Sequence, residues 1–421
     1  MTSSLGPTFG AGPRVGLLIA AGLSALCAFS SAAATSYTFT DIADTAGPFG
    51  RFGVYPSINA AGTVAFEADL TNGQLGVFTG RGGPVTTIAE TGVGSPFGSF
   101  GFPVINQRGT VAFVAGTSAG TGIFTATRGA VTPVVDNILP PFEGFADPSL
   151  NRAGTSAFVA ELKTGELQVL KGTGPPFTVV ADNRGTIDGF VNNGTSINAR
   201  GTVAFSARFK VGGAGVFTGR GGNLTAIADT DGIFSGFGQD FPKINNQGKV
   251  AFVGDLKSGD QGVFLGTGKT LTTIADTREG FSLFVNTDIN NRGTVAFSGF
   301  LDAGGEGIFT GADLTADRVI GTGDVLDGAT VIRLGGGAGL SRIDLNDRGQ
   351  LVFGATLSDG REGIFRADPA LEPVPEPPTL LLWGTMITGL GFAAHRGQAQ
   401  SGERRRPRRR RAWVSPGWWR R

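Results

Sequence analysis

The chain has 421 residues with 35 Lys+Arg and 34 Asp+Glu, and it contains one cysteine and one histidine. Cys27 lies near the N-terminus and His395 near the C-terminus, so the long region between them has neither side chain. That region therefore cannot form disulfides, zinc-thiolate sites, histidine metal sites or a Ser-His catalytic triad.

The first 34 residues predict a secretory signal peptide. Arg14 precedes an apolar run over residues 15–29, and the small residues Ser-Ser-Ala-Ala-Ala follow at 30–34. A basic residue, a short apolar segment and a small-residue cleavage site are the parts of such a signal. We expect signal peptidase to cleave near Ala34. An uncleaved membrane anchor is the alternative, although the run is short for a full span.

A phrase of the form Asn-x-x-Gly-x-x-Ala-Phe recurs seven times along the chain. Its copies begin at Asn59, Asn106, Asn151, Asn198, Asn245, Asn290 and Asn346, at spacings of 47, 45, 47, 47, 45 and 56 residues. A fixed period in this range indicates that one supersecondary unit is copied, and that the copies bury apolar faces against each other.

The second copy predicts four strands, over residues 102–106, 109–116, 122–126 and 131–137. They are rich in β-branched and aromatic residues, and Gly, Asn and Ser separate them. Asn106 and Gly109 suit a chain reversal, because Asn can bond its own backbone and Gly accepts a positive φ. Val111 and Phe113 then face one side and Ala112 the other, where a neighbouring sheet can approach. The alternative is that the seven asparagines line a ligand-binding ring.

Four strands in such a period are typical of the blade of a β-propeller. The last copy stops after its third strand at residues 363–366, and a segment like the missing fourth strand stands before the first copy, at 39–45. An N-terminal strand that completes the last blade closes the ring and leaves no sheet edge exposed. We therefore predict an all-β, seven-bladed β-propeller of four-stranded antiparallel blades over residues 35–369. An open β-solenoid is the alternative.

The repeat resembles the bacterial tandem-repeat family named for its N-x-x-G-x-x-A-F phrase, whose members carry a choice of C-terminal anchors. Six of the seven copies match the phrase closely. The last copy has Val352 in place of alanine, and the third has Ser156 before Ala157 and Phe158. The family has no established biochemical activity, so the resemblance implies the architecture and an export route and leaves the ligand open.

The C-terminal part has a linker over residues 370–378 that contains Val374, Pro375, Glu376 and Pro377, a hydrophobic segment over 379–396 and a basic tail over 397–421. This order resembles a PEP-CTERM sorting signal, which bacteria with an exosortase recognise on exported proteins. The resemblance implies transient inner-membrane anchoring through residues 379–394. Exosortase would then cleave near the Pro-Glu-Pro motif, and the protein would reach the cell surface or the extracellular space.

The basic tail is longer than such signals usually are, with nine arginines between Arg404 and Arg421. We expect it to be a disordered extension of the sorting signal, and a nucleic-acid-binding arm is the alternative. Residues 35–373 hold 24 basic and 32 acidic residues, a net charge of −8. We expect no nucleic-acid partner for this region, because phosphate neutralisation needs clustered Lys and Arg.

Carboxylates recur in the predicted fourth strand, at Asp44, Glu90, Asp136, Asp182, Asp229 and Asp276. At equivalent places in a ring, their oxygens could hold Ca²⁺ at a channel mouth. The fragment most like a calcium loop, Asp229-Thr230-Asp231-Gly232, lacks the further acidic residues of such a loop. We therefore expect these carboxylates to bond turns between blades, and we predict no metal site.

The long interval after Asn290 predicts an insertion between strands, in residues 320–329 and 334–339. Its glycines are not followed by the lysine or the helix start that a nucleotide-binding loop requires. Because loops carry function while repeated strands carry packing, this segment is where we expect a distinctive surface.

The predicted function is that of an exported, non-catalytic binding or structural module, monomeric and without a cofactor. The sorting context makes extracellular polysaccharide the candidate partner, although the four tryptophans lie after residue 380 and the only tyrosines are Tyr37 and Tyr55. No catalytic residue is assigned, and no ligand-binding residue is singled out. The alternative is an extracellular glycan hydrolase that uses paired carboxylates. Recurrence of equivalent carboxylates argues against it, because catalysis needs an asymmetric site.

Overall fold

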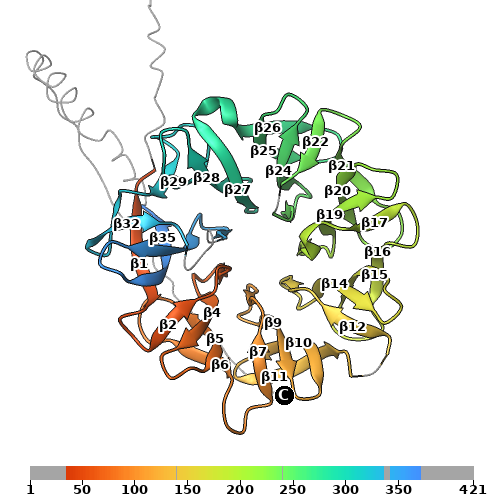
Figure 1. The fold of residues 1–421 in the computed structure, drawn as a ribbon, viewed down its shortest axis with the longest axis horizontal. Coiled ribbons are helices and arrows are strands. Elements are labelled where there is room, and N and C mark those ends of the chain that lie inside the picture. The colour runs from red at the N-terminus through yellow and green to blue at the C-terminus, as the bar shows by residue number, and fades with distance from the viewer. Residues whose placement is uncertain (1–34, 139, 239, 336–341, 371–421) are drawn as a thin grey trace, which may run out of the picture. The chain divides into compact units, whose positions relative to one another are not determined.

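The computed structural model describes residues 35–138, 140–238, 240–335 and 342–370. Their strands form seven antiparallel sheets arranged as blades around a central opening (Figure 1). The chain is a seven-bladed β-propeller, which confirms the predicted fold. Blades are numbered here by the asparagine phrase that each contains, from Asn59 in blade 1 to Asn346 in blade 7.

The strands of blades 1 to 6 run outward from the central opening in chain order, and blade 7 does so for its first three strands. The innermost strands, most of them split in two, are β2 (Phe49–Phe52) with β3 (Ser57–Ile58), β7 (Phe97–Phe100) with β8 (Val104–Ile105), β12 (Phe142–Phe145) with β13 (Ser149–Leu150), β17 (Ile187–Phe190) with β18 (Ser196–Ile197), β22 (Phe234–Phe237) with β23 (Lys243–Ile244), β27 (Phe281–Ile289), and β32 (Ala329–Arg333) with β33 (Asp344–Leu345). The second strands are β4 (Val64–Leu70), β9 (Val111–Thr117), β14 (Ser156–Leu162), β19 (Val203–Phe209), β24 (Val250–Leu256), β28 (Val295–Leu301) and β34 (Leu351–Leu357).

The outer half of each blade completes the sheet. The third strands are β5 (Leu75–Gly80), β10 (Gly120–Thr127), β15 (Leu167–Gly172), β20 (Ala214–Gly219), β25 (Gln261–Gly266), β29 (Glu306–Phe309) and β35 (Glu362–Pro369). The fourth strands are β6 (Thr86–Glu90), β11 (Ala130–Asp136), β16 (Thr178–Asp182), β21 (Thr225–Asp229), β26 (Leu271–Asp276), β30 (Arg318–Gly321) and β1 (Tyr37–Asp44). A short β31 (Val325–Leu326) pairs with β32, and the 3-10 turns η1 (Val191–Asn193) and η2 (Thr277–Glu279) complete the elements.

The ring closes as the sequence predicts. Strand β1, from the N-terminal side, pairs antiparallel with β35 and becomes the outermost strand of blade 7. Its side chain Ile42 is only 2% exposed and packs with Phe49, Phe66 and Val352, so it joins blade 7 to the core beside blade 1.

The second strand carries the core between blades. In blade 2, Phe113 and Val111 are buried and pack against Ala65 and Val77 of blade 1. The alanine of one blade therefore lies against the phenylalanine of the next, because its small side chain allows the two sheets to approach. This contact confirms the predicted role of the Ala-Phe pair.

The innermost strand begins earlier than the sequence analysis places it. In blade 2 it starts with β7, where Phe97 and Phe100 lie 6.2 and 5.7 Å from Phe113 between ring centroids. A bulge between Phe97 and Ser99 interrupts the alternation of inward and outward side chains along the strand. The sequence therefore lacks the period of two by which strands are recognised. The Phe-x-x-Phe spacing that precedes most of the asparagine phrases could have revealed this strand.

The predicted insertion over residues 320–329 and 334–339 is partly wrong. Ile320 belongs to β30, the regular fourth strand of blade 6, and Ala329 starts the regular first strand of blade 7. Extra residues instead lengthen the connection from β32 to β33, of which 336–341 lie outside the described residues. The backbone N–H of Leu334, where this connection starts, donates to the Glu306 carboxylate.

Substitution of Ile42 by aspartate should open the ring at its closing strand. An uncompensated buried charge costs about 3–5 kcal/mol, and β1 is held in blade 7 without a covalent link to β35. We expect a matching fall in the free energy of unfolding, measured by urea denaturation followed by circular dichroism.

The matched control is Thr38→Lys, which places a charge on an exposed position of the same strand. Its free energy of unfolding should stay within about 0.5 kcal/mol of the native value. Equal effects of the two substitutions would contradict closure of the ring through β1.

Candidate functional site

The seven phrase asparagines form a buried ring around the central opening. Each is 3–5% exposed, and its Oδ1 accepts backbone N–H groups two and four residues ahead at 2.9–3.1 Å. The phrase glycines complete the turns with φ of 74–92°. These contacts confirm the predicted role of the asparagines in chain reversal.

The same asparagines also join neighbouring blades. In six cases Nδ2 donates to the backbone carbonyl of the phrase asparagine in the next blade, at 2.9–3.2 Å. The bond from Asn346 to Asn59 crosses the closure of the ring. Because both ends of the amide are occupied, these side chains hold the wall of the opening together and are not available to a ligand.

A second set of inter-blade bonds lies two residues before the phrase asparagine. There the side-chain oxygens of Ser57 and Ser196 each accept the N–H of an isoleucine in the next blade, both at 3.2 Å. Asp288 and Asp344 do the same, accepting the N–H groups of Leu345 and Ile58 at 2.6 and 2.7 Å. A polar residue at this position in six of the seven copies was a signal that the sequence analysis missed.

The central opening contains a cavity of about 1170 Å³ lined by the first strands of all seven blades. Its wall is most varied four residues before the phrase asparagine, where the blades carry Tyr55, Phe102, Asp147, Gly194, Phe241, Asn286 and Arg342. The blades share one scaffold, but the cavity they enclose is chemically asymmetric.

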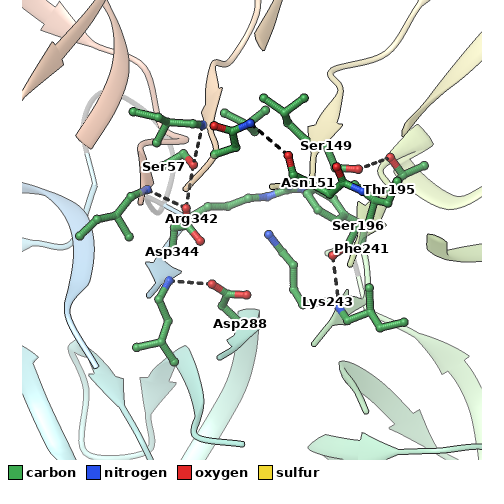
Figure 2. Close-up of a pocket in the computed structure, with 18 of the residues that line it drawn as sticks. Ser57, Ser149, Asn151, Thr195, Ser196, Phe241, Lys243, Asp288, Arg342 and Asp344 are labelled. Atoms are coloured by element: carbon green, nitrogen blue, oxygen red, sulfur yellow. Dashed lines mark hydrogen bonds between the residues drawn. The ribbon is translucent and has the colours of Figure 1, made fainter. Parts of the chain in front are cut away.

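Arg342 lies across this cavity (Figure 2). Its guanidinium carbon is 4.2 Å from the ring centroid of Tyr55 in blade 1 and 4.3 Å from that of Phe241 in blade 5. Its Nε is 3.2 Å from Oδ1 of the buried Asp240. Contacts with two aromatic faces and a buried carboxylate hold the Arg342 guanidinium in a defined position across the cavity.

Two carboxyl groups from adjacent blades meet in the wall. Burial, and then the charge of Asp344, raise the pKa of Asp288 well above its usual range, while the nearby Lys243 opposes this shift. The Asp344 carboxyl group lies close enough to accept a hydrogen bond from a protonated Asp288, which also raises this pKa. The pair is therefore less negative than two free aspartates.

Asp147 is another unusual acid of the cavity. Burial raises its pKa to about 6, although the N–H of Phe102, 3.1 Å from Oδ1, and the charge of Arg342 both favour the carboxylate. Close by, burial and the charge of Asp69 raise the pKa of Glu67 to about 7.

The carboxylates at the ends of the fourth strands do not reach the channel mouth, so they cannot form a shared calcium site there. They lie on the outermost strands, and Oδ1 accepts the backbone N–H two residues ahead in the Asp residues at 44, 136, 182, 229 and 276. The predicted bonding of turns is confirmed for these five positions. In the most calcium-like fragment, the donor is the N–H of Asp231.

A cluster of three carboxylates lies where the ring closes. Single oxygens of Asp41, Asp44 and Asp327 lie within 4.8 Å of one another. Arg361 contacts two of them, with its Nη1 3.0 Å from Asp44, and it also pairs with Asp359 at 2.8 Å. The guanidinium supplies positive charge to this cluster.

Several predicted segments lie outside the described residues. These are the signal peptide, the sorting motif at Val374, Pro375, Glu376 and Pro377, the hydrophobic segment and the basic tail. Among the residues that the structure describes, no helix has the length and apolar character to cross a bilayer.

The comparisons with known proteins give no activity for this chain. Residues 40–178, about a third of the chain, match a family of unknown function, DUF7453. No curated protein matches the sequence.

Two solved structures resemble the chain at low sequence identity. A chain from a structural and mechanistic study of two prolyl endopeptidases is 13% identical, with 77% of this chain and 51% of that chain covered and a TM-score of 0.47. The present chain thus spans about half the length of that relative. A chain from the crystal structure of a mitotic checkpoint complex is 11% identical, with coverage of 87% and 99% and a TM-score of 0.42. Neither likeness bears on activity.

The raised pKa of Asp147 predicts a pH dependence of stability. A folded-state pKa of about 6, above the usual aspartate pKa of 3.8, means that the folded protein binds this proton more tightly than the unfolded chain does. The resulting stabilisation is complete below pH 4 and is lost as pH rises through 6; two pKa units correspond to about 3 kcal/mol. Urea unfolding from pH 4 to pH 7 should therefore show a smaller decline for Asp147→Asn than for the native protein.

The control is Glu161→Gln on an exposed position of β14. Its stability profile should run parallel to that of the native protein. If Asp147→Asn also runs parallel, the shift at Asp147 does not contribute to stability.

Proposed function

We propose that the protein is an exported, non-catalytic binding module of the cell surface or extracellular matrix, and that its ligand enters the central cavity. The observation that carries this proposal is the contrast between repeated scaffold and varied wall. Asparagine, glycine and phenylalanine recur in every blade, whereas the position four residues before the asparagine differs almost every time. Packing alone gives no reason for that diversity.

The wall offers the groups expected of a saccharide site. Tyr55, Phe102 and Phe241 bring aromatic rings to the cavity, and Asp147 and Lys243 bring polar groups. Ligand pockets combine apolar surface with a few oriented polar groups, and amphipathic aromatics are suited to contacts with sugar rings. A segment of an extracellular polysaccharide is therefore the proposed ligand.

The export route rests on the two ends of the sequence. Residues 1–34 fit removal by signal peptidase, and the motif at 374–377 with the apolar residues 379–394 fits transient anchoring and cleavage by exosortase. A monomer is proposed, because closure through β1 leaves no open sheet edge for a second copy to pair with.

A glycan hydrolase is the second candidate, and the meeting of Asp288 and Asp344 in the cavity wall is the observation that favours it. Glycosidases keep their two carboxyl groups about 5 Å apart or more, so that water or the sugar can lie between them. Here the two groups lie within hydrogen-bonding reach of each other and also accept backbone N–H groups. This arrangement favours a role in holding blades 6, 7 and 1 together.

Binding should be tested with the purified full chain and exopolysaccharide from its own organism. We expect retention of the protein on the polymer without shortening of the polymer chains. Phe102→Ala should weaken retention roughly tenfold or more, as for a buried aromatic anchor. Thr178→Ala, on the exposed face of the outer strand β16, is the matched control and should bind as the native protein does.

Two outcomes would contradict the proposal. Release of reducing ends that Asp288→Asn abolishes would make the protein a hydrolase. Recovery of the tagged full chain only from the cytoplasm of its organism would exclude the export route.

A further inference from the structure

The two faces of the propeller carry opposite charge. In an antiparallel blade, the turn after the first strand and the turn after the third strand lie at one edge, and the turn after the second strand and the link to the next blade lie at the other. The first of these edges contains the turns of the phrase asparagines, six of which line the central cavity. We call it the asparagine face, and the other edge the hairpin face.

Cations gather in two circles on the asparagine face. Six of the seven asparagine turns carry an exposed Lys or Arg, at Arg108, Arg152, Arg200, Lys249, Arg292 and Arg348. Farther from the axis, four of the turns between third and fourth strands carry another, at Arg81, Arg128, Arg220 and Lys269.

The inner circle is available for an ionic partner. Among the described residues, none of its six cations forms an ion pair within the protein. On the hairpin face, Arg184, Arg278 and Arg361 pair with carboxylates, whereas Lys163, Lys210 and Lys257 form no ion pair among the described residues. This face also carries exposed acids in its loops, including Asp231, Asp302 and Asp359.

We infer that the asparagine face is a docking surface for an acidic polysaccharide, a chain that carries carboxylate or sulfate groups. This inference rests on the proposed function and names the class of its ligand. A face with many unpaired cations attracts a polyanion, and salt weakens that attraction.

The cavity favours a linear saccharide over a flat membrane. Arg108 and Arg152 line the cavity as well as the face, so the positive surface continues inward. Inside, Lys243 lies 4.3 Å from the centroid of Phe241 and makes no ion pair within the described part of the chain. A flexible acidic chain can reach these groups while its flanking residues lie on the inner circle, whereas a bilayer surface cannot.

This segregation changes the interpretation of the net charge. Residues 35–373 have a net charge of −8, from which the sequence analysis expects no clustered Lys and Arg. The structure does cluster them, because the acids lie mainly on the hairpin face. The net charge therefore does not exclude a polyanionic ligand, and DNA is included among the ligands of the binding experiment below.

The test uses the full chain with three substitutions on either face. Arg108→Glu, Arg200→Glu and Arg292→Glu together remove cations of the inner circle. The control variant carries Lys163→Glu, Lys210→Glu and Lys257→Glu on the hairpin face, which change the net charge by the same amount. Both variants keep the basic tail, so its contribution to binding is the same in each. Binding of polygalacturonate is measured by calorimetry, with neutral dextran, vesicles containing phosphatidylglycerol and single-stranded DNA as comparisons.

We expect the native protein to bind polygalacturonate more tightly than dextran, vesicles or DNA. The asparagine-face variant should lose about tenfold or more in affinity, and the hairpin-face variant should stay within about twofold. If the Glu variant does not fold, the Arg→Gln triple at the same positions should show the same direction of change.

Equal losses in the two variants, absence of polygalacturonate binding, or tighter binding of vesicles or DNA would overturn the inference. Binding of dextran alone, weakened by Phe102→Ala, would overturn it while leaving the proposed function in place. Recovery of the protein only from the cytoplasm would instead overturn the proposed function, whatever the outcome of the binding test.

Discussion

The side-chain amide of the phrase asparagine is the contact on which the ring depends. Its oxygen fixes the turn within one blade, and its nitrogen binds the backbone of the next blade. One buried side chain thus links local chain reversal to the packing of neighbouring sheets. Buried amides are costly unless all their polar groups are bonded, and here the repeat itself supplies the partners.

A wall held by backbone and asparagine contacts allows its other side chains to vary. The first strands present Tyr55, Asp147, Phe241 and Arg342 at equivalent depth without disturbing the inter-blade bonds. Arg342 compensates its own burial through Asp240 and two aromatic faces. The difference in charge between the two faces arises in a similar way, because exposed turn positions accept any polar or charged side chain. Repetition supplies the scaffold, and departures from repetition supply the chemistry of the cavity.

The sequence predicted the fold because its signals are local and recur seven times. Phrase spacing, turn residues and the orphan strand at 39–45 were sufficient for the blade count and for closure. The cavity could not be predicted in the same way, because Tyr55 and Phe241 are 186 positions apart and meet only through Arg342. Likewise, the raised pKa of Asp147 depends on burial by other blades, and the charge of each face depends on which edge a turn occupies. Aligning the seven copies would have exposed the varied position, but not the contacts across the ring.

The most direct test of the account compares Asn198→Ala with Asn72→Ala by urea unfolding. Both asparagines bond backbone groups in a turn, but Asn198 is buried and also binds the next blade, whereas Asn72 is exposed in the hairpin after β4. An unpaired buried polar group costs about 1–3 kcal/mol, so Asn198→Ala should lower the free energy of unfolding by at least about 2 kcal/mol more than Asn72→Ala does. Equal losses would contradict the claim that the asparagine ring holds the blades together.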